Sequence, residues 1–150
     1  MLKKKYFFFI VVLPLIFSIA SCDKEDKADE VRKAIVGTWE LISVTVDGQA
    51  LDADELLSYP SLVQFQSNSI FQVYNQSTGK KTRGGWSYEG DMLNISLYLP
   101  AAFYIMDVNS VNLNLKRYDF NEDSSLRNTF LRYQRVDDSK IDNPDEDSDE

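Results

Sequence analysis

Apolar and polar side chains alternate along much of the middle of this chain. Every second residue from Leu93 to Leu99 is leucine or isoleucine, and every second residue from Val111 to Leu115 is valine or leucine. A period of two places the apolar side chains of a β-strand on one face of the sheet. These segments are therefore predicted to be strands with one buried face and one solvated face, which is typical of antiparallel sheet.

Eight segments between residues 31 and 136 have this strand character, and turn residues separate them. We expect strands at residues 38–46, 61–66, 70–74, 81–88, 92–99, 103–108, 111–120 and 126–135. Successive antiparallel strands leave exposed edges unless the first strand pairs with the last. The predicted fold class is therefore all-β, an eight-stranded antiparallel up-and-down barrel with one or two short helical turns.

Helical turns are expected at two places. Asp52 precedes Glu55 by three residues, which is the spacing of a capping box, and Pro60 prevents a helix from continuing. We therefore predict one or two helical turns within residues 51–59. Residues 31–36 are expected to form another short turn before the first strand.

The N-terminal segment has the pattern of a secretory signal peptide. Lysines at positions 3–5 precede an apolar run over residues 6–20, and Pro14 interrupts this run. The run is shorter than the about 20 apolar residues of a membrane-spanning helix. A basic start, a short apolar run and small residues at its end predict a signal peptide over residues 1–21, whose products belong outside the cytoplasm.

The residues at the end of this run, Ile19-Ala20-Ser21-Cys22, resemble the lipobox of bacterial lipoproteins. The resemblance implies that Cys22 is acylated, becomes the N-terminus of the mature chain and holds the protein on a membrane. Isoleucine stands where leucine is more usual. The alternative is an ordinary cleaved signal peptide followed by a free thiol, which is a liability in a secreted chain.

The residues that follow Cys22 are mostly charged, so residues 22–30 are expected to form a tether. Within them, Lys24-Glu25-Asp26 resembles the signal that sends some Gram-negative lipoproteins to the outer face of the outer membrane. A plain solvated linker explains these residues equally well. We therefore expect a lipid-anchored outer-membrane protein, on either the periplasmic face or the cell surface.

Acidic residues dominate the charge of the chain. Its 150 residues include 24 Asp and Glu, 16 Lys and Arg and no histidine, which gives a formal net charge of −8. Many of the acids lie in residues 137–150, which are expected to be a disordered acidic tail after a barrel at residues 31–136. We expect no nucleic-acid partner, because binding phosphates requires a basic surface.

Composition also limits the chemistry of the chain. The lack of histidine excludes a Ser-His-Asp triad, a Cys-His pair and a histidine-ligated metal. The single cysteine excludes an internal disulfide and a metal site made only of cysteines. The carboxylates near the central strands are expected to face solvent or to sit in turns, and they are Glu40, Glu89, Asp91 and Asp107.

One acidic series, Asp119-x-Asn121-x-Asp123, resembles the start of a calcium loop. Ser124 and Phe130 occupy the positions at which such a loop needs glycine and glutamate. A hairpin turn is therefore the better interpretation. We expect no catalytic residue, no metal and no cofactor in this chain.

The start of the first expected strand, Gly37-Thr38-Trp39, is similar to the Gly-x-Trp signature of lipocalins. Other similar segments are the Val46-Asp47-Gly48 turn, Gly85-Trp86-Ser87-Tyr88 and the final Tyr133-Gln134-Arg135. Over residues 34–135 the chain thus resembles the lipocalin-like domains of small bacterial lipoproteins. The resemblance implies that a late basic residue, Arg132 or Arg135, packs over Trp39. The predicted domain is shorter than typical lipocalins, and we do not expect their long C-terminal helix in it.

Large apolar side chains on these strands either fill the barrel or line a pocket for one small ligand. The expected lining of such a pocket includes Trp86, Tyr88, Phe65, Phe71 and Ile95. The first functional hypothesis is a membrane-anchored lipoprotein that binds a small apolar or amphipathic molecule at the barrel mouth. The alternative is a filled barrel whose loops engage another envelope protein, with no small-molecule ligand.

Overall fold

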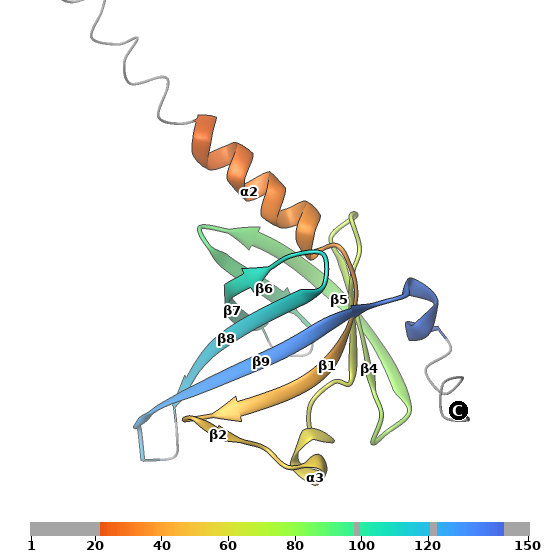
Figure 1. Cartoon of the computed structure of the whole chain (residues 1–150), viewed down its shortest axis with the longest axis vertical. Helices are drawn as coiled ribbons and strands as arrows, with labels where there is room; N and C mark the ends of the chain where they lie inside the picture. Colours follow the sequence, from red (N-terminus) through yellow and green to blue (C-terminus); the bar gives the residue numbers. More distant parts are fainter. Residues whose placement is uncertain (1–21, 98–99, 121–122, 143–150) are drawn as a thin grey trace, which may run out of the picture.

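The computed structural model describes residues 22–97, 100–120 and 123–142 (Figure 1). The expected signal peptide, residues 1–21, and the last part of the expected acidic tail, residues 143–150, lie outside the described residues. In the described part of the chain, no helix has the length and apolar character needed to cross a membrane.

Within the described residues, eight long antiparallel strands form a closed barrel (Figure 1). They are β1 Gly37–Val46, β3 Leu62–Phe65, β4 Ile70–Asn75, β5 Lys80–Glu89, β6 Met92–Ser96, β7 Pro100–Val108, β8 Asn112–Phe120 and β9 Leu126–Val136. Each strand pairs with the next of this set, and β1 also pairs with β9, which closes the sheet. A short extra strand, β2 Gln49–Ala50, forms a hairpin with the end of β1. The predicted eight-stranded up-and-down barrel is confirmed.

The alternation seen in the sequence determines which side chains fill the barrel. Leu113 and Leu115 of β8 are buried, as are Leu131 and Tyr133 of β9, whereas the residues between them are more exposed. The antiparallel register places Leu113 opposite Tyr133 and Leu115 opposite Leu131. Buried side chains of neighbouring strands therefore stack in one shared interior, and their removal from water stabilises the closed sheet.

The helix α3 (Ala53–Leu56) begins where the capping box was predicted. The Asp52 side chain accepts a hydrogen bond from the backbone N–H of Glu55 at 2.9 Å. The Glu55 carboxylate accepts one from the backbone N–H of Asp52 at 3.0 Å. Together these bonds satisfy two backbone donors at the helix start. With β2, α3 lies at the end of the barrel that β1 reaches at Val46 (Figure 1).

The opposite end of the barrel carries a longer helix than the sequence indicated. We expected a tether at residues 22–30 and a short turn at 31–36, but α2 runs without a break over Cys22–Ile35. Ala28 and Val31 pack against the barrel core and Ile35 is fully buried, so one end of the helix is seated on the barrel. The charged residues are also good helix formers, and their composition alone did not reveal this.

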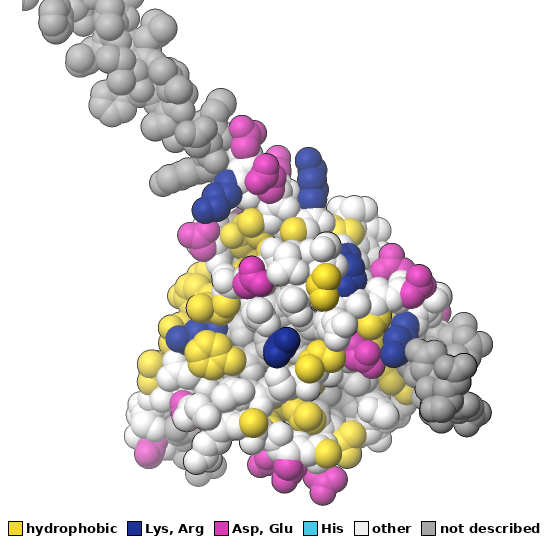
Figure 2. Space-filling view, viewed as in Figure 1, with side chains coloured by type: hydrophobic (Ala, Val, Ile, Leu, Met, Phe, Trp, Pro, Cys, Tyr) yellow, Lys and Arg dark blue, Asp and Glu magenta, His cyan; other side chains and the backbone are white. Residues whose placement is uncertain are grey.

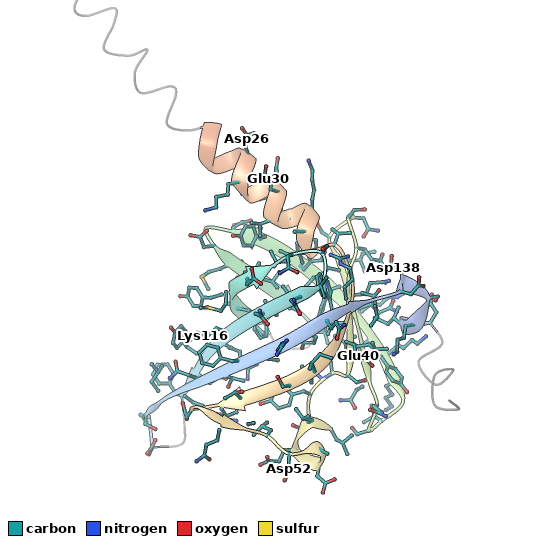
Figure 3. The ribbon with its side chains drawn as sticks, in the orientation of Figure 1. Asp26, Glu30, Glu40, Asp52, Lys116 and Asp138 are labelled. Atoms are coloured by element: carbon teal, nitrogen blue, oxygen red, sulfur yellow. The ribbon has the colours of Figure 1, made fainter. Side chains whose placement is uncertain are left out.

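The outer part of α2 extends away from the barrel (Figures 1 and 3). Asp26 and Glu30 project from this part, and Figure 3 shows them clear of the strands. Near the barrel, an Asp29–Arg32 ion pair of 3.0 Å links one helical turn to the next. The segment expected to be a tether is therefore a helix with charged sides.

The start of the expected acidic tail is also folded. Residues Asp138–Ile141 form a short 3-10 helix, η1, in which Ile141 is buried against Leu62 and Tyr74. The Thr38 hydroxyl donates a hydrogen bond of 2.8 Å to Asp138. The expectation that disorder begins at residue 137 is therefore wrong up to residue 142. The single large apolar residue of this acidic stretch holds the stretch against the barrel.

Candidate functional site

The closed end of the barrel lies beside α2 and is occupied by Trp39 and Arg135. The Arg135 guanidinium stacks 4.2 Å from the centre of the Trp39 ring. It also donates hydrogen bonds to the carbonyl oxygens of Val36 at 2.8 Å and Ala34 at 2.7 Å. Of the two arginines expected over Trp39, the structure places Arg135 there, while Arg132 is exposed on the outer face.

Trp39 and Gly37 complete this closure. The Trp39 ring is fully buried, and its Nε1–H donates a 2.8 Å hydrogen bond to the carbonyl of Ile35. Gly37 has φ of +140°, and a Cβ at this position would collide with the Arg135 guanidinium. Only glycine fits both the backbone angle and the space. The Gly37, Trp39 and Arg135 group therefore seals one end of the barrel, and a ligand would have to enter elsewhere.

A cavity of about 180 Å³ lies inside the barrel, away from this seal. The segment after α3 contributes Tyr59 and Pro60 to its wall. The other lining residues come from β3, β4, β6, β7, β8 and β9 and from the residue after β6. The lining residues from the strands and their ends are Val63, Phe65, Phe71, Val73, Ile95, Leu97, Ala101, Phe103, Leu115, Arg117, Leu131 and Tyr133. Most of the wall is apolar, so water in this cavity would find few hydrogen-bond partners.

Three of the five side chains expected to line a pocket lie on this cavity. Phe65, Phe71 and Ile95 are all buried and all border it. The Phe65 and Phe71 rings are 4.8 Å apart at their centres, with a tilt of 41°. They form a fixed aromatic wall on β3 and β4.

The other two expected residues lie elsewhere, and that part of the expectation is corrected. Trp86 donates a 2.9 Å hydrogen bond from its Nε1–H to the carbonyl of Gln66. Its ring makes an edge-to-face contact with Phe65 but does not line the cavity. The carbonyl of Tyr88 accepts a 2.9 Å hydrogen bond from Arg32 of α2. Alternation correctly predicted that both side chains lie on the inner face of β5. Both residues are near the end of this strand that lies at the closed end of the barrel, beside α2.

The Tyr88 side chain is part of the packing beneath α2. Its hydroxyl lies 3.4 Å from the Asp91 carboxylate. Burial raises the pKa of the Tyr88 phenol, and the neighbouring Asp91 charge raises it further. The phenol therefore stays neutral and donates to Asp91 at neutral pH.

The polar groups of the cavity wall are Tyr59, Arg117 and Tyr133, of which Tyr59 and Arg117 were not expected there. Arg117 continues the inward-facing series of Leu113 and Leu115 on β8, and this spacing was the signal that could have found it. Its Nε–H donates to the Asp119 carboxylate at 2.7 Å, and the Arg117 side chain is 37% exposed. Arg117 thus stands where the cavity approaches solvent.

Tyr133 is the deeply buried polar group of this wall, with 4% of its surface exposed. Burial raises the pKa of its phenol, the nearby Tyr59 raises it further, and the Arg117 charge opposes this rise. Tyr59 and Arg117 are therefore close enough to affect the Tyr133 phenol. At neutral pH the Tyr133 hydroxyl is uncharged and able to donate a hydrogen bond.

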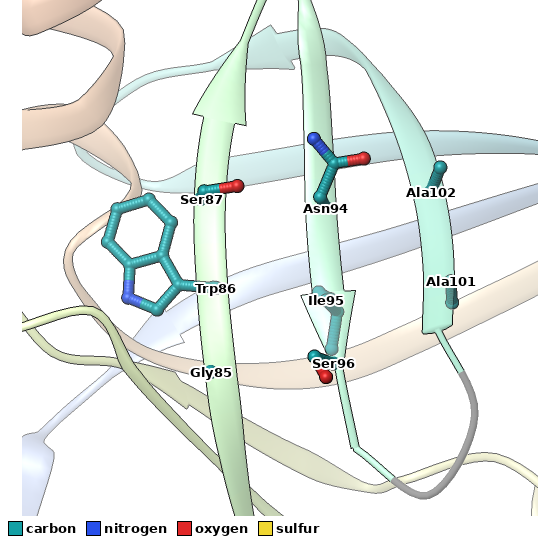
Figure 4. Close-up of a pocket in the computed structure, with 8 residues that line it drawn as sticks. All are labelled: Gly85, Trp86, Ser87, Asn94, Ile95, Ser96, Ala101 and Ala102. Atoms are coloured by element: carbon teal, nitrogen blue, oxygen red, sulfur yellow. The ribbon is translucent and has the colours of Figure 1, made fainter.

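A second hollow, of about 350 Å³, lies on the outer face of β5, β6 and β7 (Figure 4). Its lining includes Trp86 and Ile95, but the other side chains are short, and Ser87 and Ser96 are exposed to solvent. Figure 4 shows the Trp86 ring directed away from β6 and β7, so the ring does not form a floor for this hollow. Without large enclosing side chains the hollow offers a ligand little burial, and the interior cavity is the better candidate site.

Three of the four carboxylates near the central strands have structural partners, Asp91 through its contact with Tyr88. Glu40 pairs with Lys140 at 3.3 Å, and Asp107 accepts a 3.0 Å hydrogen bond from Asn109. Asp119 of the calcium-like series pairs with Arg117. Among the described residues, no three acidic or cysteine side chains gather in a way that would hold a metal ion.

The sequence model of the lipocalin-like domain matches residues 35–123, more than half of the chain. Comparison with curated protein sequences gives no match. A bovine odorant-binding protein in complex with a selenium-containing odorant is a similar solved structure, with 10% identity, a TM-score of 0.48 and coverage of 75% of this chain and 77% of that chain.

Two further solved structures are similar. The bovine lipocalin allergen Bos d 2 has 13% identity and a TM-score of 0.48, with coverage of 70% of this chain and 75% of that chain. A DUF4847 family protein from Bacteroides vulgatus has 13% identity and a TM-score of 0.45, with coverage of 68% of this chain and 94% of that chain.

Proposed function

Because the chain belongs to the family of lipocalin-like domains, we propose that it binds one small hydrophobic molecule inside the barrel. The observation that carries this proposal is the interior cavity of about 180 Å³ with its mostly apolar wall. The Phe65–Phe71 ring pair and the side chains of Leu115 and Leu131 offer a preformed surface for an apolar body. Such a concave, apolar site with few polar groups is the usual form of a small-molecule pocket.

The size of the cavity limits the ligand. A cavity of about 150 Å³ in another protein holds a benzene molecule, so this cavity suits an apolar body of about six to eight non-hydrogen atoms. A long-chain lipid needs a pocket of several hundred Å³ and would not fit. For so small a ligand we expect a Kd between about 1 µM and 1 mM.

The proposal includes a lipid anchor on Cys22 in the outer membrane. The signal-peptide pattern of residues 1–21 and the lipobox at Cys22 support the anchor. The helix α2 starts at Cys22 and is seated on the barrel at Ile35. At 1.5 Å per residue it would hold the barrel up to about 21 Å from the anchored residue, so the barrel would stay clear of the lipid headgroups.

Isothermal titration calorimetry of the chain without residues 1–21 tests ligand binding. The probes are hexan-1-ol, hexanoate, 2-phenylethanol and phenylacetate, whose apolar bodies match the cavity. At least one should bind with a stoichiometry near one per chain. Leu115→Phe, which adds volume to the cavity wall, should abolish binding at a stability cost of about 1–3 kcal/mol. Met106→Phe is the matched control on the outer face, where Met106 is 57% exposed, and it should bind normally.

A second candidate function is an interaction protein of the cell envelope, and one surface favours it. Apolar side chains gather around Lys116 on the outer face of three strands (Figures 2 and 3). We call this surface the β7–β9 patch, and its exposed apolar residues are Tyr104, Met106, Tyr118, Phe120, Leu126 and Phe130. The Lys116 ammonium lies 4.4 Å from the centre of the Tyr118 ring and 4.9 Å from that of Phe130.

Exposed apolar patches of this kind often mark protein interfaces. If the patch is the functional surface, Phe120→Ser should abolish a crosslink to another envelope protein in intact cells, and none of the four probes should bind. If Phe120→Ser leaves crosslinking unchanged while a probe binds at one per chain, the cavity proposal stands.

A further inference from the structure

Two polar side chains of the cavity wall, Tyr133 and Arg117, have hydrogen-bond donors without a partner among the described residues. Tyr133 is 4% exposed and borders the cavity, yet within the described residues its hydroxyl has no hydrogen-bond partner. Native proteins pair nearly all of their buried polar groups, with protein atoms, water or ligand. The Tyr133 hydroxyl oxygen is not among the fully buried unpaired atoms, so it is open to the cavity and can take a partner there.

Arg117 has spare donors at the same cavity. Its Nε–H is committed to Asp119 at 2.7 Å, but its two terminal nitrogens make no hydrogen bond with the described residues. A guanidinium offers five N–H donors in a fixed fork, and this arrangement suits a carboxylate that accepts two of them. The lining residues of the cavity include no aspartate or glutamate, so nothing in the wall itself occupies these donors.

The neighbouring strand carries a fully buried hydroxyl without a partner. Thr129 lies directly opposite Arg117 in the β8–β9 register and is 1% exposed, and its hydroxyl has no hydrogen-bond partner. Opposed side chains on one face of antiparallel strands are about 5 Å apart at Cβ. Polar groups without a partner among the described residues are thus found on the paired strands β8 and β9, at Arg117, Thr129 and Tyr133.

From this arrangement, and resting on the proposed function, we propose that the ligand of the cavity is a small monocarboxylate. Its apolar body lies against Phe65, Phe71 and Leu131, and its carboxylate accepts hydrogen bonds from Arg117 and Tyr133. Arg117 supplies the charge, and Tyr133 supplies a neutral donor that selects for an acceptor. Tyr59, at the cavity wall beside Pro60, is the remaining hydroxyl within reach of the polar end.

Because the chain as a whole is acidic, binding of a carboxylate requires a positive charge inside the cavity, and Arg117 supplies it. Without residues 1–21, which carry three lysines, the formal net charge changes from −8 to −11. The protein therefore repels anions at long range, and this repulsion is screened beyond about 8 Å at physiological ionic strength. A carboxylate can therefore be held only by short-range contacts with donors in the cavity. Burial raises the pKa of the Tyr133 phenol, so this donor does not become a competing anion near neutral pH.

The test compares hexanoate with hexan-1-ol, which share one six-carbon chain and differ at the polar end. Calorimetry of the chain without residues 1–21 should give a Kd for hexanoate at least tenfold lower than that for hexan-1-ol. Arg117→Gln should weaken hexanoate binding at least tenfold and leave hexan-1-ol binding within about twofold. The unchanged alcohol affinity would show that the variant still folds with an intact cavity.

Three further variants separate recognition of the carboxylate from general damage. Asp119→Asn removes the negative charge that competes for Arg117 and weakens its hydrogen bond to the Nε–H, so it should strengthen hexanoate binding and leave hexan-1-ol unaffected. Tyr133→Phe should weaken hexanoate binding about three- to tenfold and hexan-1-ol binding less, because a carboxylate is a stronger acceptor than a hydroxyl. Arg132→Gln is the matched control, because Arg132 lies on β9 but faces outward, and it should change neither Kd.

The outcomes distinguish this inference from the proposed function. If hexan-1-ol binds as tightly as hexanoate, or if Arg117→Gln weakens both equally, the carboxylate inference is overturned while a hydrophobic cavity site stands. If neither probe nor the phenylacetate and 2-phenylethanol pair binds, both the inference and the proposed function are overturned. Selective loss of hexanoate in Arg117→Gln supports both.

Discussion

Replacing Trp39 with alanine removes the side chain that seals the closed end of the barrel. The ring is fully buried, so its loss should cost about 3–5 kcal/mol as a large-to-small change in a core. The substitution also removes the cation–π contact with Arg135, worth about 0.5–2 kcal/mol, and leaves the Ile35 carbonyl without its donor. Because these effects overlap, the expected loss is about 4–6 kcal/mol. A typical domain has only about 5–15 kcal/mol of stability.

Urea unfolding followed by far-ultraviolet circular dichroism measures this loss. With an m value of about 2 kcal/mol per molar urea, the midpoint should fall by about 2–3 M. Arg132→Ala is the control, because Arg132 lies three residues before Arg135 but faces solvent, and it should change stability by less than about 0.5 kcal/mol. A midpoint for Trp39→Ala within about 0.5 M of the parent protein would refute the assignment of Trp39 as the seal.

Three other predictions concern Ile141, Tyr133 and Cys22. Ile141→Ala should lower the free energy of unfolding by about 2–4 kcal/mol in urea titration, because Ile141 is 1% exposed against Leu62 and Tyr74; no change would mean that η1 is detached in solution. Because burial raises the pKa of Tyr133 above its unfolded value, its contribution to stability is constant below about pH 10 and is lost as the pH rises further. Tyr133→Phe should flatten this alkaline loss, and an identical pH profile in both proteins would contradict the burial. Cys22→Ala should abolish acylation and release the protein from membranes, as mass spectrometry of the mature N-terminus and cell fractionation would show; an unmodified Cys22 in the parent protein would refute the anchor.

The strands were predictable because their physics is local. Alternation on β8 and β9 requires only that one face be buried, and turn residues between the strands fix their number. The start of α3 was equally local, since Asp52 and Glu55 satisfy each other's backbone donors. Closure of the barrel followed from the need to pair the edge strands.

The helix α2 and the 3-10 helix η1 were missed because tertiary contacts decide them. The sequence between Cys22 and Glu30 is charged, and its helix is fixed by packing at the other end, where Ile35 enters the core. Residues 137–142 are acidic, and a single apolar side chain, Ile141, docks them. Composition averages over such single contacts and therefore predicted a tether at residues 22–30 and a disordered tail from residue 137.

The site was only partly predictable because alternation gives the face of a strand but not the height along the barrel. Trp86 and Tyr88 face inward as expected, yet they lie near the closed end, whereas Phe65 and Phe71 border the cavity. Arg117 was overlooked because a charged residue was not expected on an inner face. Its place two residues after Leu115 was the available clue.

The most direct test of the central claim, that the interior of the barrel binds a small molecule, is to locate a bound probe by nuclear magnetic resonance. Backbone amide shifts of the isotope-labelled chain without residues 1–21 would be followed during titration with hexanoate. We predict saturable shifts at Phe65, Ile95, Leu115 and Leu131, with intermolecular contacts from the hexanoate methylenes to these side chains. Shifts confined to the β7–β9 patch, or no saturable shift at any residue, would contradict it.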